Sequence, residues 1–478
     1  MRVRSRIASL TALGLLAGGI AVTVGIGPSS AAPRPQRGGQ AHVLYVSNTS
    51  GGIADSTLRS AGRWGSPGLP SAIGIQGCAS APNTTISAAV AAASAGDTIA
   101  VCPGVYDEDV VVPVGKPLTV EGLGNPTIDA YDSATNTSLD NGVQVLASNT
   151  TIEGLTVSYA EGEGILVGAC DEDTAPTTTP EWAACIADSS EPTLQNVTIR
   201  NNTVMDNDRG NPTGAVLSTS TYSQCNGAAG PPAGTPGPPA VPGDCGEGIH
   251  LLSAVDSTVM DNVVTGNSGG ILLSDENGPT DGNLIASNDV SGNAYDCGIT
   301  VAGHHVGTTT NGTTWSTVLP TVGGVFNNTI SDNETTNNGV LGQGAGVLLA
   351  TGAPGGAVYD NVVDGNTISG NGLAGVTVHS HSPGENLNGN TIHDNTIGTN
   401  DLDGDFDFGG NLPLGADVDA LTTGVIVANA TGNNPITITI ANNRIENNHY
   451  GIWTTPLVTG TFAPNAFFGV TTDTFTAP

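Results

Sequence analysis

Basic residues are scarce in this sequence. Only 11 of its 478 residues are lysine or arginine, and Lys116 is the single lysine, against 43 aspartates and glutamates. The formal net charge is therefore −32 at pH 7. A chain this acidic repels nucleic acid and anionic membranes, and it repels polyuronates unless a divalent cation bridges the two. We therefore expect neither nucleic acid nor a membrane surface as a partner.

Long apolar stretches are also lacking after the first 32 residues. The start of the chain has the three parts of a secretion signal, namely basic residues, an apolar stretch and a small-residue cleavage site, at Arg2 to Arg6, Leu10–Ile26 and Ser30–Ala32. The sequence thus predicts a signal peptide over residues 1–32, with an uncleaved anchor as the alternative. No second apolar span follows, so we expect a secreted, extracellular protein.

Glycine and asparagine are abundant, and they recur in a pattern. Residues 262–274 read NVVTGNSGGILLS, which is Asn-x-[Ile/Val]-x-x-Asn followed by a glycine, an isoleucine and further apolar residues. Copies of the first half begin at Asn202, Asn262, Asn288, Asn328, Asn366, Asn390 and Asn443. The closest copies are 24 residues apart (Asn366 to Asn390) and 26 residues apart (Asn262 to Asn288). Such a fixed period is the signature of a repeat architecture.

Each half of the repeat holds a β-prone stretch too short for a helix, bounded by Asn and Gly. Asparagine tolerates left-handed backbone, and stacked turns would place Asn above Asn in a ladder of amides. One copy per coil predicts a parallel β-helix, in which each coil pairs with the next. The repeats resemble those of secreted, pectate-lyase-like proteins over roughly residues 85–455. That resemblance implies an all-β, single-stranded, right-handed parallel β-helix, but no particular activity, because this fold carries enzymes and non-catalytic stalks alike.

Four segments follow from this reading. After the signal come a linker or first strand over residues 33–83, the β-helix over 84–455 and a C-terminal cap over 456–478, for which a disordered tail is the alternative. A short helix, capped by Thr84 or Thr85 and ended by Gly96, is predicted to cover the open N-terminal end of the core. Long loops are predicted to be inserted at residues 170–192, 208–247, 306–322 and 398–423.

Seven cysteines fit an oxidising compartment. Three local disulfides are predicted, Cys78–Cys102, Cys170–Cys185 and Cys225–Cys245. Cys297 is left over within a repeat and is predicted to be a buried, small apolar residue. Connectivity is not derivable from sequence, so these pairs are hypotheses.

Candidate catalytic groups follow the Gly-[Ile/Val] strands, where consecutive coils would place them on one edge. They are Asp275, Glu276, His304, His305, His379 and His381. The first two pairs would lie on adjacent coils, and the last histidines two coils further. Carboxylates and imidazoles on one edge can act as general acid and base or bind a transition metal. The alternative is a ridge of solvated turn residues.

Four alternate aspartates form a second candidate site, for calcium. Asp401, Asp403, Asp405 and Asp407 crowd carboxylates that cannot all be ionised at close range without a cation. Oxygen ligands of this kind suit Ca²⁺. The spacing does not match an EF-hand loop, and a solvated acidic loop is the alternative.

Two functions remain open. No catalytic motif of the pectate-lyase-like superfamily is found, which favours a non-catalytic, monomeric β-helix that binds extracellular polysaccharide or serves as a structural surface protein. The alternative is a polysaccharide lyase or glycoside hydrolase acting on the solenoid face, possible with or without calcium. Aromatic residues that could contact sugar are Tyr295, Trp315, Tyr450 and Trp453.

Overall fold

The chain divides into two units, Met1–Gln40 and Ala41–Pro478, and every residue described by this computed structural model belongs to the second unit. The described residues are 41–48, 77–132, 137–138, 141–160, 162–168, 193–207, 247–275, 278–303, 323–341, 344–351, 355–380, 384–402, 421–429 and 435–477. The predicted signal peptide lies outside them. Among the described residues, no helix is long and apolar enough to cross a membrane.

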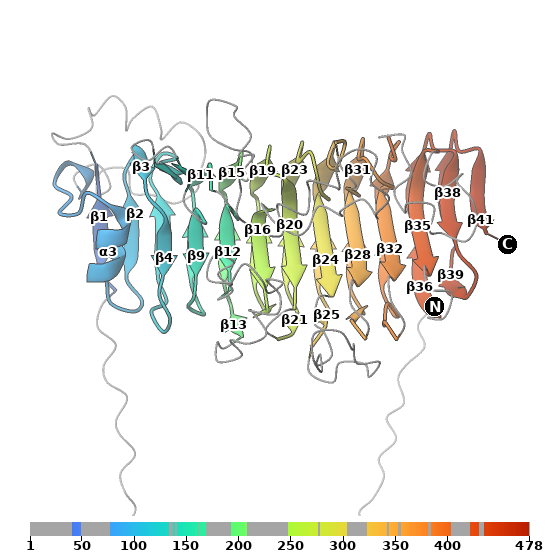
Figure 1. Cartoon of the computed structure of the whole chain (residues 1–478), viewed down its shortest axis with the longest axis horizontal. Coiled ribbons are helices and arrows are strands. Elements are labelled where there is room, and N and C mark those ends of the chain that lie inside the picture. The colour runs from blue at the N-terminus through green and yellow to red at the C-terminus, as the bar shows by residue number, and fades with distance from the viewer. Residues whose placement is uncertain are drawn as a thin grey trace, which may run out of the picture. The chain divides into compact units, whose positions relative to one another are not determined.

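Parallel strands stack coil upon coil into a β-helix, which confirms the predicted fold class (Figure 1). Its first long face, sheet A, has twelve strands, all paired in parallel. In order they are β1 (Val43–Val46), β2 (Thr98–Val101), β5 (Thr119–Gly122), β10 (Thr151–Glu153), β14 (Thr198–Arg200), β18 (Thr258–Met260), β22 (Leu284–Ala286), β26 (Thr329–Ser331), β30 (Val362–Asp364), β33 (Thr391–His393), β36 (Ile436–Ala441) and β39 (Val458–Thr461).

Sheet B is the second long face and has eleven parallel strands. They are β3 (Val105–Asp107), β6 (Thr127–Asp129), β11 (Thr156–Ser158), β15 (Thr203–Met205), β19 (Val263–Thr265), β23 (Asp289–Ser291), β27 (Glu334–Thr336), β31 (Thr367–Ser369), β34 (Thr396–Ile397), β37 (Arg444–Glu446) and β40 (Ala466–Phe468).

Sheet C, the third long face, also has eleven parallel strands, and its strands cross the front of Figure 1. They are β4 (Val110–Val112), β9 (Val143–Val145), β12 (Ile165–Val167), β16 (Glu247–Leu252), β20 (Gly269–Ser274), β24 (Ile299–Gly303), β28 (Val347–Thr351), β32 (Val376–Ser380), β35 (Thr423–Asn429), β38 (Tyr450–Thr454) and β41 (Thr472–Thr476).

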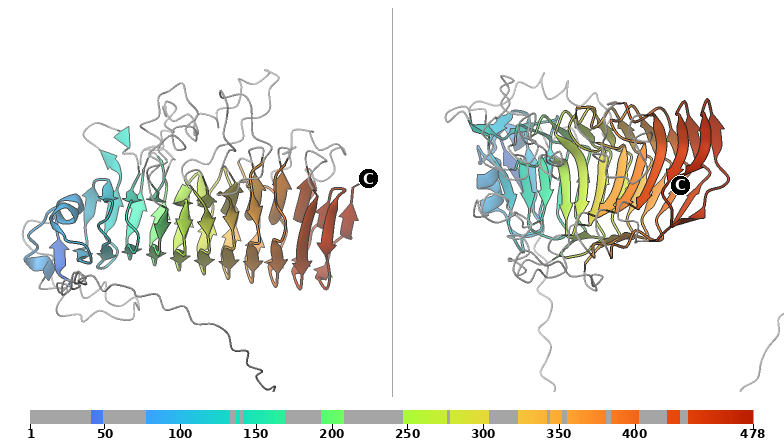
Figure 2. Two further views of the ribbon diagram at one scale, coloured as in Figure 1. Left: turned by 90° about the horizontal axis from the view of Figure 1, so that it is seen from below. Right: turned by 45° about the vertical axis from the view of Figure 1, so that its right-hand side comes forward.

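The middle coils add a short fourth sheet between sheets C and A. Its strands are β13 (Leu194–Gln195), β17 (Ala254–Val255), β21 (Thr280–Asp281), β25 (Val325–Phe326) and β29 (Val358–Tyr359). A separate antiparallel pair is formed by β7 (Tyr131–Asp132) and β8 (Thr137–Ser138). Seen from the side, the coils repeat in a row, strand over strand (Figure 2).

Apolar residues point inward at alternate positions, one on a three-residue strand and two on a longer strand such as β16, because successive side chains alternate between the two faces of a strand. From β2 to β36, the paired inward column of sheet A is fully buried and consists of isoleucine and valine: Ile99, Val120, Ile152, Ile199, Val259, Ile285, Ile330, Val363, Ile392 and Ile440. Columns of this kind from the long sheets form one continuous core. Burial of β-branched side chains on a pleated surface therefore explains why such short stretches form strands.

Stacked asparagines occupy the turns, as predicted. One ladder, at the turn from sheet A to sheet B, contains Asn202, Asn262, Asn288, Asn333, Asn366, Asn395, Asn443 and Asn465. A second, at the turn from sheet B to sheet C, contains Asn207, Asn267, Asn293, Asn338, Asn371, Asn400 and Asn448. A third, before sheet A, contains Asn283, Asn328, Asn361 and Asn390.

A side chain in the middle of a ladder connects three coils. Asn333, for example, accepts from the backbone N–H and side-chain Nδ2 of Asn288 at 3.0 and 2.9 Å. Its own Nδ2 donates forward to Asn366 Oδ1 and back to the carbonyl of Ile285, at 3.0 and 2.9 Å. The amide thus satisfies every hydrogen-bonding group that it buries, which is the condition for a polar column inside a solenoid.

The predicted alignment of the repeats was wrong in two coils. Asn328 and Asn390 stand in the third ladder, and the 24-residue coil inferred from Asn366 to Asn390 is a slip of five residues, because Asn366 stacks on Asn395. Successive ladders are also five residues apart, so the Asn motif occurs at two turns of one coil. The 26-residue coil from Asn262 to Asn288 is confirmed.

A short helix, α3 (Ile86–Ala92), packs on the first coils through its buried residues Ile86, Ala89 and Val90. Of the two predicted caps, Thr85 is the one that accepts, from the N–H of Ala88 at 3.2 Å. The helix ends at Ala92 rather than at the predicted Gly96, since Ala93 already has extended backbone.

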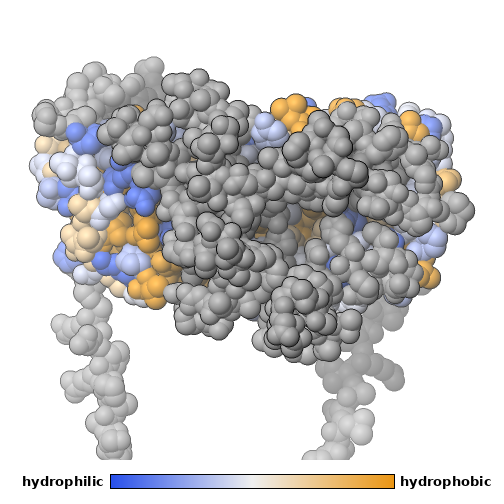
Figure 3. All heavy atoms as spheres, in the orientation of Figure 1, coloured by the Kyte–Doolittle hydropathy of each residue, from blue (hydrophilic) through white to orange (hydrophobic). Residues whose placement is uncertain are grey.

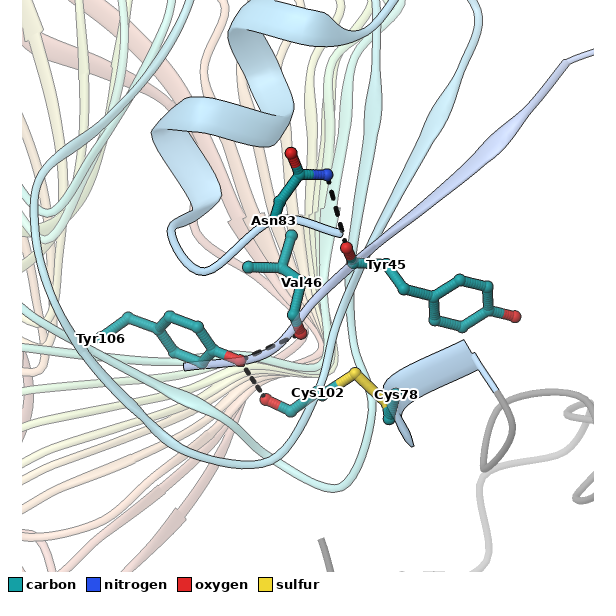
Figure 4. Close-up of a disulfide and its surroundings, with 6 residues drawn as sticks. All are labelled: Tyr45, Val46, Cys78, Asn83, Cys102 and Tyr106. Atoms are coloured by element: carbon teal, nitrogen blue, oxygen red, sulfur yellow. Dashed lines mark hydrogen bonds between the residues drawn. A yellow bond between two sulfur atoms is a disulfide. The ribbon is translucent and has the colours of Figure 1, made fainter. Parts of the chain in front are cut away.

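A disulfide joins Cys78 to Cys102 beside this helix, as predicted (Figure 4). The hydroxyl of Tyr106 donates between the carbonyls of Val46 and Cys102, at 3.1 and 2.8 Å. Burial raises the pKa of Tyr106 to about 12, so the neutral phenol holds β1 to the next coil. The residues of the predicted pairs Cys170–Cys185 and Cys225–Cys245 lie outside the described residues, and Cys297 is buried and unpaired with another cysteine, as predicted.

Strands of the long sheets lie in both segments that flank residues 84–455. Within residues 33–83, β1 pairs with β2 and is the first strand of sheet A. The segment 456–478, predicted to be a cap, supplies β39, β40 and β41, which are the last strands of the three long sheets. Phe462 and Phe467 pack against the end of the core, so the phenylalanines of this segment serve a further coil rather than a separate cap.

Replacement of Asn333 by alanine tests the ladder. It leaves two buried donors of Asn288 and the carbonyl of Ile285 without their partner, so we expect the free energy of unfolding to fall by about 3 kcal/mol. Urea unfolding followed by circular dichroism measures this. Ser331→Ala, on the outer face of the same strand β26, should change it by no more than about 0.5 kcal/mol. Equal effects of the two substitutions would contradict the role of the ladder.

Candidate functional site

The outer face of sheet C carries one cluster of buried polar side chains. Alternation along β16 places Ile249 and Leu251 in the core and therefore turns His250 outward. At the same outward position, the paired strands carry Leu166 and Leu272. At the N-terminal end of sheet C, apolar side chains of the outer face reach solvent (Figure 3). Val111 on β4 is 40% exposed.

His250 contacts a carboxylate and a hydroxyl from the two neighbouring coils. Its Nδ1 lies 3.1 Å from Oε1 of Glu163, which precedes β12, and its Nε2 lies 2.7 Å from Oγ of Ser274, at the end of β20. The three residues are exposed by 1%, 3% and 0%, in the order Glu163, His250 and Ser274. Both ring nitrogens are thus used, and the neutral tautomer with Nδ1–H satisfies both contacts.

A second buried carboxylate lies beside this cluster. Glu247 and Glu163 each stand two residues before a paired isoleucine, Ile249 and Ile165, so they occupy equivalent positions on adjacent coils. The next coil has Gly269 there, and a side chain at Gly269 would meet Glu247 Oε1 at 3.1 Å. The coil sequence thus leaves room for this glutamate.

Most other described coils of sheet C carry uncharged residues at these outward positions. Beyond Glu247, the position of Glu163 is held by uncharged residues, and that of Ser274 is held by alanine in three later coils and by His379 in one: Cys297, Ala345, Ala374, Thr423, and Ala302, Ala350, Ala428. Burial of a carboxylate and an imidazole costs several kcal/mol unless they are paired. Groups that break a local pattern at such cost mark candidate functional sites.

The predicted catalytic edge is only partly visible. Asp275 is buried and accepts from the N–H of Gly324 at 2.6 Å, which ties one coil to the next. His379 is also buried, at the register position of Ser274 but three strands further along sheet C, or about 14 Å away at the usual strand spacing. The structure therefore does not bring Asp275 and His379 together. Glu276, His304, His305 and His381 lie outside the described residues.

The predicted calcium loop is visible only at its start. Asp401 is buried, with positive φ, and Asp403, Asp405 and Asp407 lie outside the described residues. Calcium binding there stays a prediction. Of the aromatic residues expected to meet sugar, Tyr450 and Trp453 are buried in a small apolar cluster with Ala428.

A second group of polar side chains lies on the outer face of sheet A. Asp364 on β30 is paired in register with His393 on β33, and Asp394 follows in the turn with φ 57°. Nδ1 of His393 lies 3.1 Å from Oδ1 of Asp364 and 2.7 Å from Oδ2 of Asp394. The side chains are 29%, 39% and 56% exposed for His393, Asp364 and Asp394. Within the described residues, this is the one set of three ligand atoms that all lie within 4.8 Å of one another.

Sequence reasoning missed both groups, although a signal for each was present. When the strands of sheet A are aligned, Asp364 and His393 are the last residues of two neighbouring strands, β30 and β33, directly before the turn. His250 interrupts the apolar stretch of β16, and Glu163 lies two residues before the apolar strand β12. Both signals can be recognised only when the coils are correctly aligned. The five-residue slip at Asn390 gave a wrong alignment for the coil that contains His393.

Comparison with known proteins finds one matching family model and several solved structures of low sequence identity. The family model described as periplasmic copper-binding protein (NosD) matches residues 105–317 and 240–475. No curated protein matches the chain.

Three solved structures illustrate the distant likenesses. The A-module of mannuronan C-5 epimerase AlgE4 from Azotobacter vinelandii is 15% identical, covers 90% of this chain and 97% of that one, and has a TM-score of 0.41. Pectate lyase Pel9A is 13% identical over 84% of this chain and 77% of that one, with a TM-score of 0.36. The catalytic domain of Agl-KA is 11% identical over 92% and 69%, with a TM-score of 0.43. At these values the likenesses carry no inference about activity.

A double-mutant cycle tests the pairing of Glu163 with His250. His250→Leu matches the leucines that flank this position but leaves the Glu163 carboxylate buried without its imidazole, so we expect a loss of about 3 kcal/mol in the free energy of unfolding. Adding Glu163→Ala removes the stranded charge and should recover more than about 1 kcal/mol of that loss. Denaturant unfolding of the four proteins measures the coupling, and strictly additive losses would contradict the pairing.

Proposed function

The chain belongs to the NosD family of right-handed parallel β-helix proteins, and from this premise we propose that it binds copper(II) outside the cytoplasm at Asp364, His393 and Asp394. The proximity of one imidazole and two carboxylates on sheet A carries the proposal. The description of the family as periplasmic and copper-binding supports it.

The donor set suits copper(II). Imidazole nitrogen and carboxylate oxygen are ligands that Cu²⁺ accepts in tetragonal geometry, and copper stands highest among the divalent first-row metals in affinity for such sites. The two carboxylates also balance the charge of the ion. With three ligands from the protein, the remaining positions are left for water or for a ligand from a partner.

The fold supplies the positions of the three ligands. Register pairing of β30 with β33 sets Asp364 beside His393, and the left-handed turn at Asp394 directs its carboxylate back to the same nitrogen. In the free protein the Nδ1 proton of His393 is held between the carboxylates. A metal at Nδ1 displaces that proton, so binding weakens as the pH falls.

Titration with Cu²⁺, followed by calorimetry and electron paramagnetic resonance, tests the site. We expect His393→Ala to weaken binding at least about ten-fold and to remove the nitrogen coupling of the occupied site. His449→Ala, which removes a histidine that packs against Tyr450, is the matched control and should bind as the wild type does. Equal affinity in wild type and His393→Ala would contradict the proposal.

Binding of extracellular polysaccharide, expected from the sequence, is a second candidate. Phe326 and Tyr359 support it: their rings are stacked on each other on the outer face of the short sheet, with ring centroids 4.8 Å apart and planes within 9°. Both rings are partly exposed, and a paired aromatic surface can stack on the apolar face of a sugar. The net charge of −32 favours a neutral glycan. A purely structural surface role and lyase or hydrolase activity stay predictions.

Retention on immobilised neutral glycans tests this candidate. Tyr359→Ala should lower retention several-fold because it halves the stacked surface, whereas Phe468→Ala, which removes a 46% exposed ring elsewhere, should not. A screen for new reducing or unsaturated ends on the same panel distinguishes binding from depolymerisation. Lack of retention on every glycan would contradict polysaccharide binding.

A further inference from the structure

We propose that Ser274, His250 and Glu163 form a nucleophilic triad that cleaves an ester of a short acyl group. The site lies on the outer face of sheet C and is independent of the copper site proposed on sheet A. Nucleophile, base and orienting acid are recognised by their geometry and roles rather than by their order in the chain.

The three side chains contact one another in the order that a nucleophile, a base and an orienting acid require. Ser274 Oγ lies 2.7 Å from Nε2 of His250, within reach for proton transfer. The opposite nitrogen, Nδ1, lies 3.1 Å from Oε1 of Glu163. Glu163 therefore fixes the tautomer in which Nε2 can accept the serine proton, and the two contacts are made on opposite sides of one ring.

Coil register brings the three residues together across 111 positions of sequence, from Glu163 to Ser274. They come from three consecutive coils, carried by or directly before β12, β16 and β20, which are adjacent in sheet C. Because the register is fixed over five paired positions between β16 and β20, the histidine and serine are held by the scaffold rather than by a loop. Sites built on such elements are well positioned.

Packing alone does not explain the choice of residues. The neighbouring coils carry uncharged residues at the equivalent outward positions, with Leu166 and Leu272 beside His250 and Ala302 beside Ser274, although His379 takes the position of Ser274 three strands away. A structural column could have used those residues at lower cost.

The enclosure of the triad selects the substrate. With side chains at most 3% exposed, bulk water is kept from the His250–Glu163 pair, which strengthens their interaction. Because Ser274 is 0% exposed, the proposal is restricted to an acetyl or similarly short acyl group. Esters of this kind occur on hydroxyl groups of carbohydrates and of small alcohols.

The reaction proceeds in two balanced steps. Ser274 Oγ bonds to the carbonyl carbon while its proton passes to His250 Nε2. The ester C–O bond then breaks, and the leaving alcohol takes that proton. A water molecule next attacks the acyl-serine carbonyl and gives a proton to Nε2 of His250. The bond from the acyl carbon to Ser274 Oγ then breaks, Oγ takes that proton back, and the carboxylic acid departs. Glu163 stays ionised throughout and stabilises the imidazolium through Nδ1–H.

The test uses two probes that transfer a small group to serine, methanesulfonyl fluoride and p-nitrophenyl acetate, on the full mature protein. We expect covalent sulfonylation of the peptide that contains Ser274, located by mass spectrometry, and release of nitrophenol. Ser274→Ala should abolish both, and Glu163→Gln should lower the rate of labelling at least about ten-fold through the wrong histidine tautomer.

The matched control is Ser380→Ala, which removes another fully buried serine of sheet C, three strands away from Ser274. It should label as the wild type does. Circular dichroism confirms that each variant is folded, and Ser274→Cys, which keeps a nucleophile at the same place, should still react with the ester if the alanine variant is unfolded. Absence of label on wild-type Ser274, or equal labelling of Ser274→Ala, would overturn the proposal.

Discussion

The stacked asparagine amide is the interaction on which the rest of the structure depends. Each amide is complete only when a coil lies on both sides of it, as for Asn333 between Asn288 and Asn366. A coil shifted by one residue would leave several buried donors and acceptors without partners, each at a cost of about 1–3 kcal/mol. The ladders therefore fix the register of every coil between Asn202 and Asn465.

A fixed register determines what meets on the outer faces. The inward columns need only aliphatic side chains, mostly isoleucine, valine and leucine, so they specify little beyond burial. The outward columns are free to vary, and there a residue can meet another that is far away in sequence, as Glu163 meets His250 across 87 positions. Both candidate sites arise in this way, one on sheet A and one on sheet C, and the long connections between strands leave the register unchanged.

The two ends of the β-helix are built differently from its middle. At the first coils, α3 covers the core, Thr85 caps it, and Glu108 accepts from the N–H groups of Ile86 and Ser87 at 2.7 and 2.9 Å. The Cys78–Cys102 disulfide and the Tyr106 hydroxyl join the same coils. At the other end the ladders stop at Asn448 and Asn465, and phenylalanines take over the filling of the last coil.

The sequence by itself determined the fold, because the repeat of asparagine, β-branched residues and glycine has one stable stacking. It also predicted the capping helix, the Cys78–Cys102 pair as one of three hypothetical pairs, and the burial of Cys297. Only the tertiary structure decided which asparagines stack. The same five-residue spacing separates the ladders at two turns of a coil, so the sequence pattern assigned Asn328 and Asn390 to the wrong ladder. The meetings of Asp364 with His393, and of Glu163 with His250 and Ser274, depend on that register, so they were hidden until the coils were correctly stacked.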